Sequence, residues 1–232
     1  MTGIINVYKE KGYTSFDVVA IVRRLCKVKK VGHTGTLDPQ AEGVLPVCVG
    51  RAATRLAGII TDGGKSYQAE LILGMTTDTG DHTGQVLTRS ESIPPIQDIL
   101  EAAKSFEGGY MQVPPMYSAL KINGQRLYKL ARAGQTVERA PRPVEISRIN
   151  LLEGSGNRIW IEVDCGKGTY IRSLCEDIGA KLNCGGCMGD LIRTKSGPFT
   201  VESALRLSEL ESLIEEERFD SFLLPPEVVT YG

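Results

Sequence analysis

Strands dominate the pattern of apolar and polar positions along this chain. Residues 65–73 alternate, so that Tyr67, Ala69, Leu71 and Leu73 share one face of an extended segment. Other apolar runs and alternating segments, bounded by turn residues, predict further strands. These are expected at residues 3–8, 44–49, 85–89, 143–153, 158–165 and 187–201.

Helices are expected where apolar residues recur three or four positions apart. The first begins at a Thr14 or Ser15 cap and runs to about Cys26, with an apolar stripe formed by Phe16, Val19, Val22 and Leu25. The others are expected at 51–60, from Pro95 to a stop at Gly108-Gly109, and at 126–133, 170–182 and 208–217. Because strands and helices do not alternate strictly, the pattern predicts an α+β fold with a mainly antiparallel or mixed sheet.

Two segments between these elements read as turns. Residues 74–84 are rich in Gly, Thr and Asp, and the dipeptide Asn123-Gly124 is a tight-turn signal. Asp78 and Asp81 lie in the first segment, but the spacing and closing Glu of an EF-hand are missing.

The composition is ordinary for a globular protein, with 41% hydrophobic and 24% charged residues in a chain of 232. That length can bury a substantial core, as one large domain or as a domain with an appendage. No apolar run approaches the ~20 residues that a membrane span needs. Residues 1–6 lack the basic flank and long apolar region of a secretion signal, so the cytoplasm is the expected compartment.

The six cysteines favour reduced structural thiols over a metal site. Cys184 and Cys187 form a lone CxxC, and a zinc site would need two more ligands at similar spacing. The two histidines, His33 and His82, lie in Gly-rich loops far from it in sequence. We therefore expect no metal site at these residues.

Charge is unevenly distributed, although the net charge is only −1. Residues 202–227 carry eight acids against Arg206 and Arg218, so the rest of the chain is net basic. Residues 117–148 hold seven bases and two acids, and a second basic cluster spans 23–30. Clustered bases can bind phosphates, or they can be solvated helix faces balanced by acids elsewhere, and composition does not choose between these.

Residues 32–43 form the most distinctive stretch. Three glycines and Pro39 punctuate it, Asp38 precedes the proline, and the apolar run 44–49 follows at once. Such a loop can present one carboxylate at a fixed place beside a buried strand. It can equally be a surface loop in which Asp38 bonds its own backbone. It is not a phosphate-binding P-loop, because no Gly-Lys-Ser/Thr closes it.

Four stretches together resemble the TruB family of bacterial tRNA pseudouridine-55 synthases. They are residues 9–15 (KEKGYTS), 32–39 (GHTGTLDP), 114–121 (PPMYSALK) and 166–174 (GKGTYIRSL). A fifth, residues 191–197, matches less well, because Ile192 stands where the family usually has arginine. The first also departs, with Tyr8-Lys9-Glu10 in place of the usual Asp-Lys-Pro. The resemblance runs from about residue 3 to 225.

The resemblance implies a fold and a reaction. The fold is a mixed, mostly antiparallel sheet with flanking helices and a central cleft. The reaction converts uridine-55 in the tRNA T-loop to pseudouridine by base flipping, with no cofactor or metal. The partner is the tRNA T-arm, with no membrane and no obligatory protein partner, and the chain is expected to be a monomer. Residues 1–207 would be the catalytic domain and 208–232 an acidic helix and short tail, with the family's C-terminal PUA-type domain absent.

The resemblance also implies catalytic residues. Asp38 matches the family's nucleophile or base, and Arg172 matches the arginine that holds its charge. Tyr67 would stack on the target base and aid proton transfer, Tyr170 would line the same pocket, and His33 would enter the RNA loop beside the flipped nucleotide. Without the resemblance, Arg172 reads equally well as a surface residue, the two tyrosines as core aromatics, and His33 as a turn residue.

Further residues are expected to bind substrate. The segment 117–142 would close over the T-arm, its Lys and Arg side chains meeting phosphates. The expected substrate contacts are Lys9, Lys65, Lys121, Arg126, Lys129, Arg132, Leu191, Arg193 and Lys195. Two alternative hypotheses are a non-catalytic tRNA-binding or folding factor on the same scaffold, and a synthase that acts on ribosomal RNA through guide-RNA partners. The second is disfavoured by the lack of an accessory domain.

Overall fold

The computed structural model describes residues 1–122 and 124–229. The chain forms two compact units. Unit 1 consists of Met1–Gln68 and Asp190–Gly232, and unit 2 of Ala69–Gly189. Among the described residues, no helix is long and apolar enough to cross a membrane.

The sheet of unit 1 is built around β3 (Glu42–Val49). One edge of β3 pairs antiparallel with β1 (Gly3–Lys9) along its whole length. The other edge is shared by β2 (Val31–His33), which is antiparallel, and by β12 (Gly186–Ser196), which is parallel at Arg193 and Gly43. The short β13 (Phe199–Thr200) folds back onto the end of β12.

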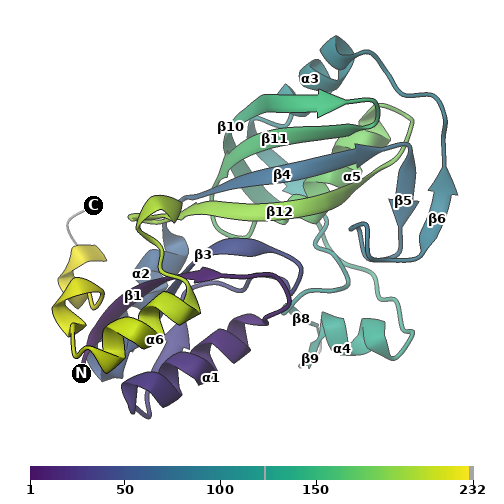
Figure 1. Ribbon diagram of the computed structural model, residues 1–232. Helices are drawn as coiled ribbons and strands as arrows, with labels where there is room; N and C mark the ends of the chain where they lie inside the picture. Colours follow the sequence, from purple (N-terminus) through teal and green to yellow (C-terminus); the bar gives the residue numbers. More distant parts are fainter. Residues whose placement is uncertain (123, 230–232) are drawn as a thin grey trace. The chain divides into compact units, whose positions relative to one another are not determined.

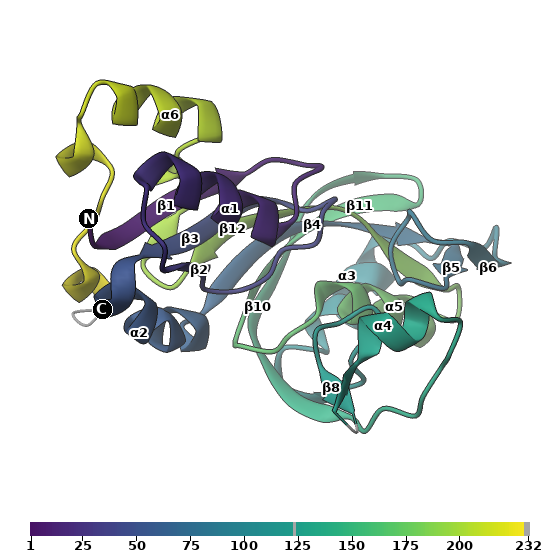
Figure 2. The same cartoon turned by 90° about the horizontal axis from the view of Figure 1, so that it is seen from below.

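Both faces of this sheet are covered, which explains why residues 44–49 form a continuous apolar run rather than an alternating one. Helices α1 (Ser15–Cys26) and α6 (Leu207–Glu215) pack on the face that carries Ile5, Leu45 and Val47. Helix α2 (Gly50–Asp62) packs on the opposite face, against Ile4, Val44 and Cys48. Figures 1 and 2 show α1 and α6 on one side of β1 and β3, and α2 on the other.

Helix α6 shows how an acidic segment contributes to a core. Leu207 and Leu210 are buried in the cluster that includes Val18 and Val22 of α1. Its acids, such as Glu209 and Glu211, are exposed. The expected domain boundary between residues 207 and 208 falls at the start of this helix, and both sides of that boundary belong to unit 1. Short 3₁₀ turns follow at Phe219–Ser221 and Pro226–Val229.

In unit 2, strands lie in the order β4 (Lys65–Leu73), β11 (Arg158–Cys165), β10 (Arg142–Ser155) and β7 (Gly108–Gln112). The β10–β11 and β10–β7 pairs are antiparallel. Helix α3 (Ile96–Lys104) contacts both β10 and α5 (Ile171–Lys181). The predicted α+β class and mostly antiparallel sheet are confirmed.

Two small hairpins complete unit 2. The first pairs β5 (Met75–Thr77) with β6 (Val86–Arg89). The second pairs β8 (Lys121–Ile122) with β9 (Gln125–Arg126) and leads into α4 (Leu127–Arg132). Asn123 of the predicted Asn123-Gly124 turn lies outside the described residues, as do residues 230–232.

Several short strands, among them β2, β5 and β7, were not expected from the pattern. β2, β5 and β7 are rich in Gly, Thr and other polar residues, and each forms because a neighbouring strand offers backbone partners. Gly108, expected to stop a helix, is instead the first residue of β7 and pairs with Ile146.

The predicted stripe of α1 was wrong at its first position. Phe16 points to solvent, with 65% of its surface exposed. The buried face is instead formed by Ser15, Val18, Val19, Val22 and Cys26. Thr14 is the cap, as expected, and its side chain accepts a hydrogen bond from the Asp17 backbone N–H at 3.1 Å.

Candidate active site

Asp38 lies half-buried in the loop of unit 1 that joins β2 to β3. The residue before it is fixed to the start of α1. The Ser15 hydroxyl accepts a hydrogen bond from the Leu37 N–H (2.9 Å) and donates one to the Leu37 carbonyl (3.1 Å). Within the loop, the Ala41 N–H donates to the Asp38 carbonyl. The backbone at Asp38 is therefore anchored to α1 on its N-terminal side.

Lys9 fixes the residue after Asp38. Its side chain is fully buried, and Nζ donates to the carbonyls of Pro39, Glu10 and Tyr13 at 3.3, 3.2 and 2.7 Å. Burial lowers the pKa of Lys9 to about 8, although the nearby carboxylates of Asp38 and Glu42 oppose that shift. We expected Lys9 to meet RNA, but its described partners are backbone carbonyls, which suits it to positioning the loop.

Arg193 braces the loop from β12. Only 1% of its surface is exposed. Its Nε donates to the Val44 carbonyl at 2.7 Å and its Nη2 to the Gly35 carbonyl at 3.2 Å. These bonds tie the two sides of the Asp38 loop together. Arg193 was also an expected substrate contact, and its buried guanidinium makes these bonds to backbone instead.

The remaining predicted residues of unit 1 differ in exposure. Tyr67 and Leu191 are each 7% exposed, whereas Lys195 is exposed. His33 is half-buried, and its Nδ1 accepts a hydrogen bond from the Gly35 N–H at 3.2 Å. Burial and the Arg193 guanidinium lower the pKa of His33, so its ring is neutral at physiological pH.

In unit 2, Arg172 is buried rather than on the helix surface, which removes the alternative that the sequence left open. It is the second residue of α5 and is 5% exposed. Its Nη1 donates to the Thr79 carbonyl at 3.1 Å and its Nη2 to the Tyr117 carbonyl at 2.7 Å. The guanidinium thus holds two separate loops of unit 2 and has a fixed orientation.

Tyr170, the residue before α5, is held through its backbone. Its N–H donates to Gln112 Oε1 at 2.8 Å, and Gln112 Nε2 donates back to the Tyr170 carbonyl at 3.1 Å. Gln112 is itself buried on β7 and also bonds the Tyr110 hydroxyl. This pair of bonds fixes the start of α5, and with it the position of Arg172 two residues later.

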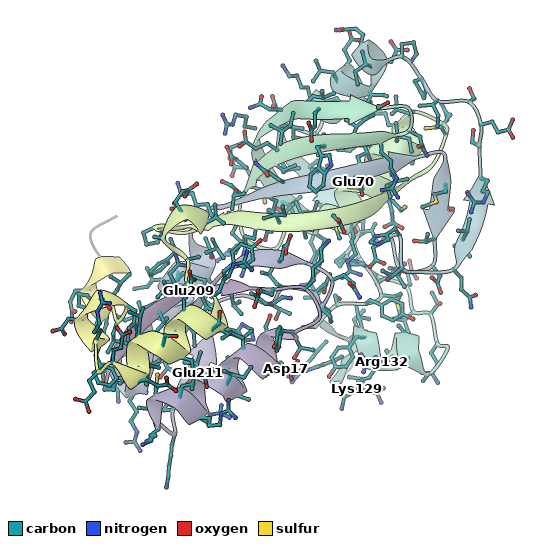
Figure 3. All side chains as sticks on the ribbon, in the orientation of Figure 1. Asp17, Glu70, Lys129, Arg132, Glu209 and Glu211 are labelled. Carbon is teal, nitrogen blue, oxygen red and sulfur yellow. The ribbon has the colours of Figure 1, made fainter. Side chains whose placement is uncertain are left out.

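Three basic residues of the 117–142 segment lie at one surface hollow. Lys121, Arg126 and Lys129 line it together with Gly124, Gln125 and Tyr128, and its volume is about 520 Å³. Arg132 lies over the Tyr128 ring at 5.5 Å. Figure 3 shows Lys129 and Arg132 on α4. The structure therefore brings three of the expected phosphate contacts to one place.

The cysteine side chains are buried thiols. All six cysteines lie in the described part of the chain, where they are buried and form no disulfide. Burial raises the pKa of Cys48 and Cys187 to about 11, so these thiols are not nucleophiles at neutral pH. Within residues 1–122 and 124–229, no three His, Cys, Asp or Glu side chains are grouped to hold a metal ion.

Comparison with known proteins identifies the family. The model of the TruB family pseudouridylate synthase N-terminal domain matches residues 23–171, well over half of the chain. The chain belongs to the TruB family. A second model, the tRNA pseudouridylate synthase B C-terminal domain, matches residues 172–230, so the two matches meet in the first turn of α5.

Two curated relatives match almost the whole length of this chain. The tRNA pseudouridine synthase B of Alkaliphilus oremlandii (strain OhILAs) is 49% identical over 225 residues, covering 97% of this chain and 74% of the relative. That of Lachnoclostridium phytofermentans (strain ATCC 700394 / DSM 18823 / ISDg) is 52% identical over 233 residues, covering 97% and 76%. Among solved structures, a chain in the crystal structure of a Cbf5-Nop10-Gar1 complex is similar, with a TM-score of 0.78 and 33% identity. That match covers 98% of this chain and 61% of the other.

Sequence reasoning missed two residues near the TruB-family motifs. One is Ser15, whose hydroxyl anchors Leu37. The other is Glu176, one helical turn after Arg172, a spacing that is visible in the sequence. A Cβ added at Gly80 would lie 3.0 Å from the Glu176 carboxylate, so this carboxylate sits directly against the loop that Arg172 binds.

Burial and the neighbouring Asp177 raise the pKa of Glu176 to about 7, against the opposing effect of the Arg172 and Arg139 guanidinium groups. Because the unfolded chain loses this proton at lower pH, the folded state should lose stability as pH rises from about 4.5 to 7. We expect Glu176→Gln to unfold at a higher temperature than the wild type at pH 8, by a few degrees, and to match it near pH 4.5.

Thermal unfolding of both proteins across this pH range measures the effect. Glu211→Gln, at an exposed position of α6, is the matched control and should show no pH-dependent difference. A constant offset between Glu176→Gln and the wild type at all pH values would contradict the prediction.

Proposed function

We propose that this protein converts uridine-55 in the T-loop of tRNA to pseudouridine. The relatives that are about 50% identical over nearly the whole chain carry the name tRNA pseudouridine synthase B. The observation that carries the proposal is Asp38 on a loop whose two flanking residues are each anchored, Leu37 by Ser15 and Pro39 by Lys9. A carboxylate held in this way is preorganised for reaction with a positioned substrate.

The reaction exchanges one glycosidic bond for another within the same nucleotide. The bond from ribose C1′ to uracil N1 breaks, the base turns, and a bond forms from C1′ to C5. The proton on C5 leaves and N1 gains a proton, so substrate and product have the same composition. Asp38 acts on the sugar or the ring as nucleophile or base, and as an anion it stabilises positive character at C1′. Arg172 supplies the counter-charge for this carboxylate.

Aromatic residues complete the proposal. Tyr67 stacks on the uracil and assists proton transfer at C5, and Tyr170 and Leu191 line the same pocket. His33, neutral in the folded protein, enters the RNA loop where the uridine leaves its stack, and stacking on its ring offsets part of the few kcal/mol needed for flipping.

The basic hollow at Lys121, Arg126 and Lys129 binds phosphates of the T-arm. We further propose that the protein acts as a cytoplasmic monomer without cofactor.

The test uses an unmodified tRNA transcript incubated with the protein. Pseudouridine is then mapped by carbodiimide-dependent primer extension, and a stop is expected at position 55 of the T-loop. A ribosomal RNA transcript serves as the comparison substrate and should remain unmodified. Tight tRNA binding without any product would favour the non-catalytic factor, and product on ribosomal RNA alone would overturn the choice of substrate.

A further inference from the structure

Phe16 is the most exposed aromatic side chain that the structure describes, at 65%. It lies on the first turn of α1, directly after the Ser15 that anchors Leu37. Its ring contacts the His33 ring, with the centroids 5.4 Å apart and the planes at 80°. Two perpendicular rings form a corner, against which a flat base can lie face-on to one ring and edge-on to the other.

Exposed residues, two of them basic, follow Phe16 along α1. Phe16, Ala20 and Arg23 are exposed and are spaced four and three residues apart, which places them on one flank of the helix. Lys27, the residue that caps the C-terminal end of α1, is also exposed. We call these four residues the α1 stripe. The opposite flank, with Ile21 and Leu25, packs into the cluster that includes α6, so the α1 stripe is the flank that this core leaves uncovered.

The α1 stripe is positively charged. Lys29 and Lys30 follow it and are also exposed. Within the described residues, the bases Arg23, Lys27, Lys29 and Lys30 make no ion pair with an acid. The acid of the first turn, Asp17, is engaged by the Thr14 cap, to which it is bonded at 2.8 Å and 2.7 Å. Bases without acidic partners beside an exposed aromatic ring are typical of surfaces that bind single-stranded nucleic acid.

We propose that the α1 stripe binds an unpaired segment of the substrate RNA, with one base stacked on Phe16 and phosphates contacted by Arg23 and Lys27. This inference rests on the proposed function and adds a contact surface to it. The rise of an α-helix places Arg23 about 10 Å from Phe16 along the axis, so one short stretch of strand can reach both. A protein partner is disfavoured, because the stripe is apolar only at Phe16 and Ala20.

The first experiment measures the affinity for a fluorescent T-arm hairpin in an Asp38→Asn background, so that turnover does not interfere. Phe16→Ala should weaken binding about tenfold, whereas Phe16→Trp should stay within about twofold of the parent, because any aromatic face can stack on a base. Leu87→Ala is the matched control, since Leu87 is equally exposed at 65% and lies on β6. Affinity for Phe16→Ala within twofold of the parent, or equal losses for Ala and Trp, would overturn the proposal.

The second experiment tests the phosphate contacts through salt dependence. Arg23→Gln with Lys27→Gln should lower the slope of log Kd against log salt by about 0.7 for each charge removed. Lys104→Gln, an exposed base on α3, should leave the slope unchanged. An unchanged slope in the double variant would overturn this part of the proposal. If the wild type neither binds nor modifies tRNA, the proposed function fails. If it does both and the α1-stripe variants match it, only this inference fails.

Discussion

Asp38→Asn is expected to abolish pseudouridine formation, lowering the rate by about 10⁴-fold or more, while tRNA affinity stays within about twofold of the wild type. An amide has nearly the same shape as a carboxylate but is neither a nucleophile nor a base of comparable strength. The anchoring bonds of the loop involve Ser15, Leu37, Lys9 and Pro39, and none of these bonds uses the Asp38 side chain. The loop should therefore keep its backbone conformation in the variant.

Single-turnover assays on a tRNA transcript measure the loss, and filter binding measures the affinity. Asp98→Asn is a suitable control, because it makes the same chemical change at an exposed position in the first turn of α3. The control should retain full activity. Residual activity of Asp38→Asn within tenfold of the wild type would show that this carboxylate does not carry the reaction.

Gly43→Ala is expected to lower the melting temperature by about 10 °C, the largest stability loss that we predict for a single methyl group. Gly43 has φ +107°, which L side chains rarely adopt. An added Cβ would lie 2.2 Å from the Arg193 carbonyl oxygen and 2.8 Å from its backbone nitrogen. Because these atoms belong to β12, which pairs with β3 at this point, no side-chain rotation relieves the clash. The strand, and the Asp38 loop that precedes it, must shift.

Calorimetry or circular dichroism measures the change in melting temperature. For a chain of this size, each kcal/mol of lost stability lowers the melting temperature by about 2–4 °C, so the expected shift corresponds to about 3 kcal/mol. Gly32→Ala is the matched control on β2, which also pairs with β3. Gly32 has no positive φ, and an added Cβ would meet nothing within 4 Å, so the melting temperature should stay within about 1 °C. Equal melting temperatures for the two variants would mean that β3 and β12 do not approach each other closely at Gly43.

The local pattern of apolar and polar residues was sufficient to predict several elements, among them β4 and α1. The alternation at 65–73 predicts β4 with its observed bounds, and the Thr14 cap with the spacing after it predicts α1. These patterns work because a strand or helix that buries one face repeats its apolar residues with the period of its own backbone. The motifs around Asp38 and Arg172 were sufficient to identify the family, because members of a family carry the same residue types in the same order along the chain.

The sequence pattern could not decide which charged residues of the motifs are buried in the folded protein. Lys9 and Arg193 resemble phosphate contacts in the sequence, yet both are buried and bond backbone carbonyls around the Asp38 loop. Two partners of Lys9 are local, but the third, Pro39, is 30 residues away, and Val44 is 149 residues from Arg193. Such contacts leave no periodic signal.

Phe16 shows that the sequence pattern also misplaces an apolar residue, which it predicted to be buried and which is exposed. Its spacing to Val19 and Val22 fits an inward stripe as well as Ser15, Val18 and Val22 do, since the two sets lie on adjacent sectors of one helix. The sequence thus determined that α1 forms, which residues carry charge and which family the chain belongs to. Only the tertiary structure decided which sector of α1 faces β3, and hence that Phe16 is exposed. It also decided that Lys9, at the end of β1, is buried. The physical reason is that burial depends on the partners an element packs against, and those partners are distant along the chain.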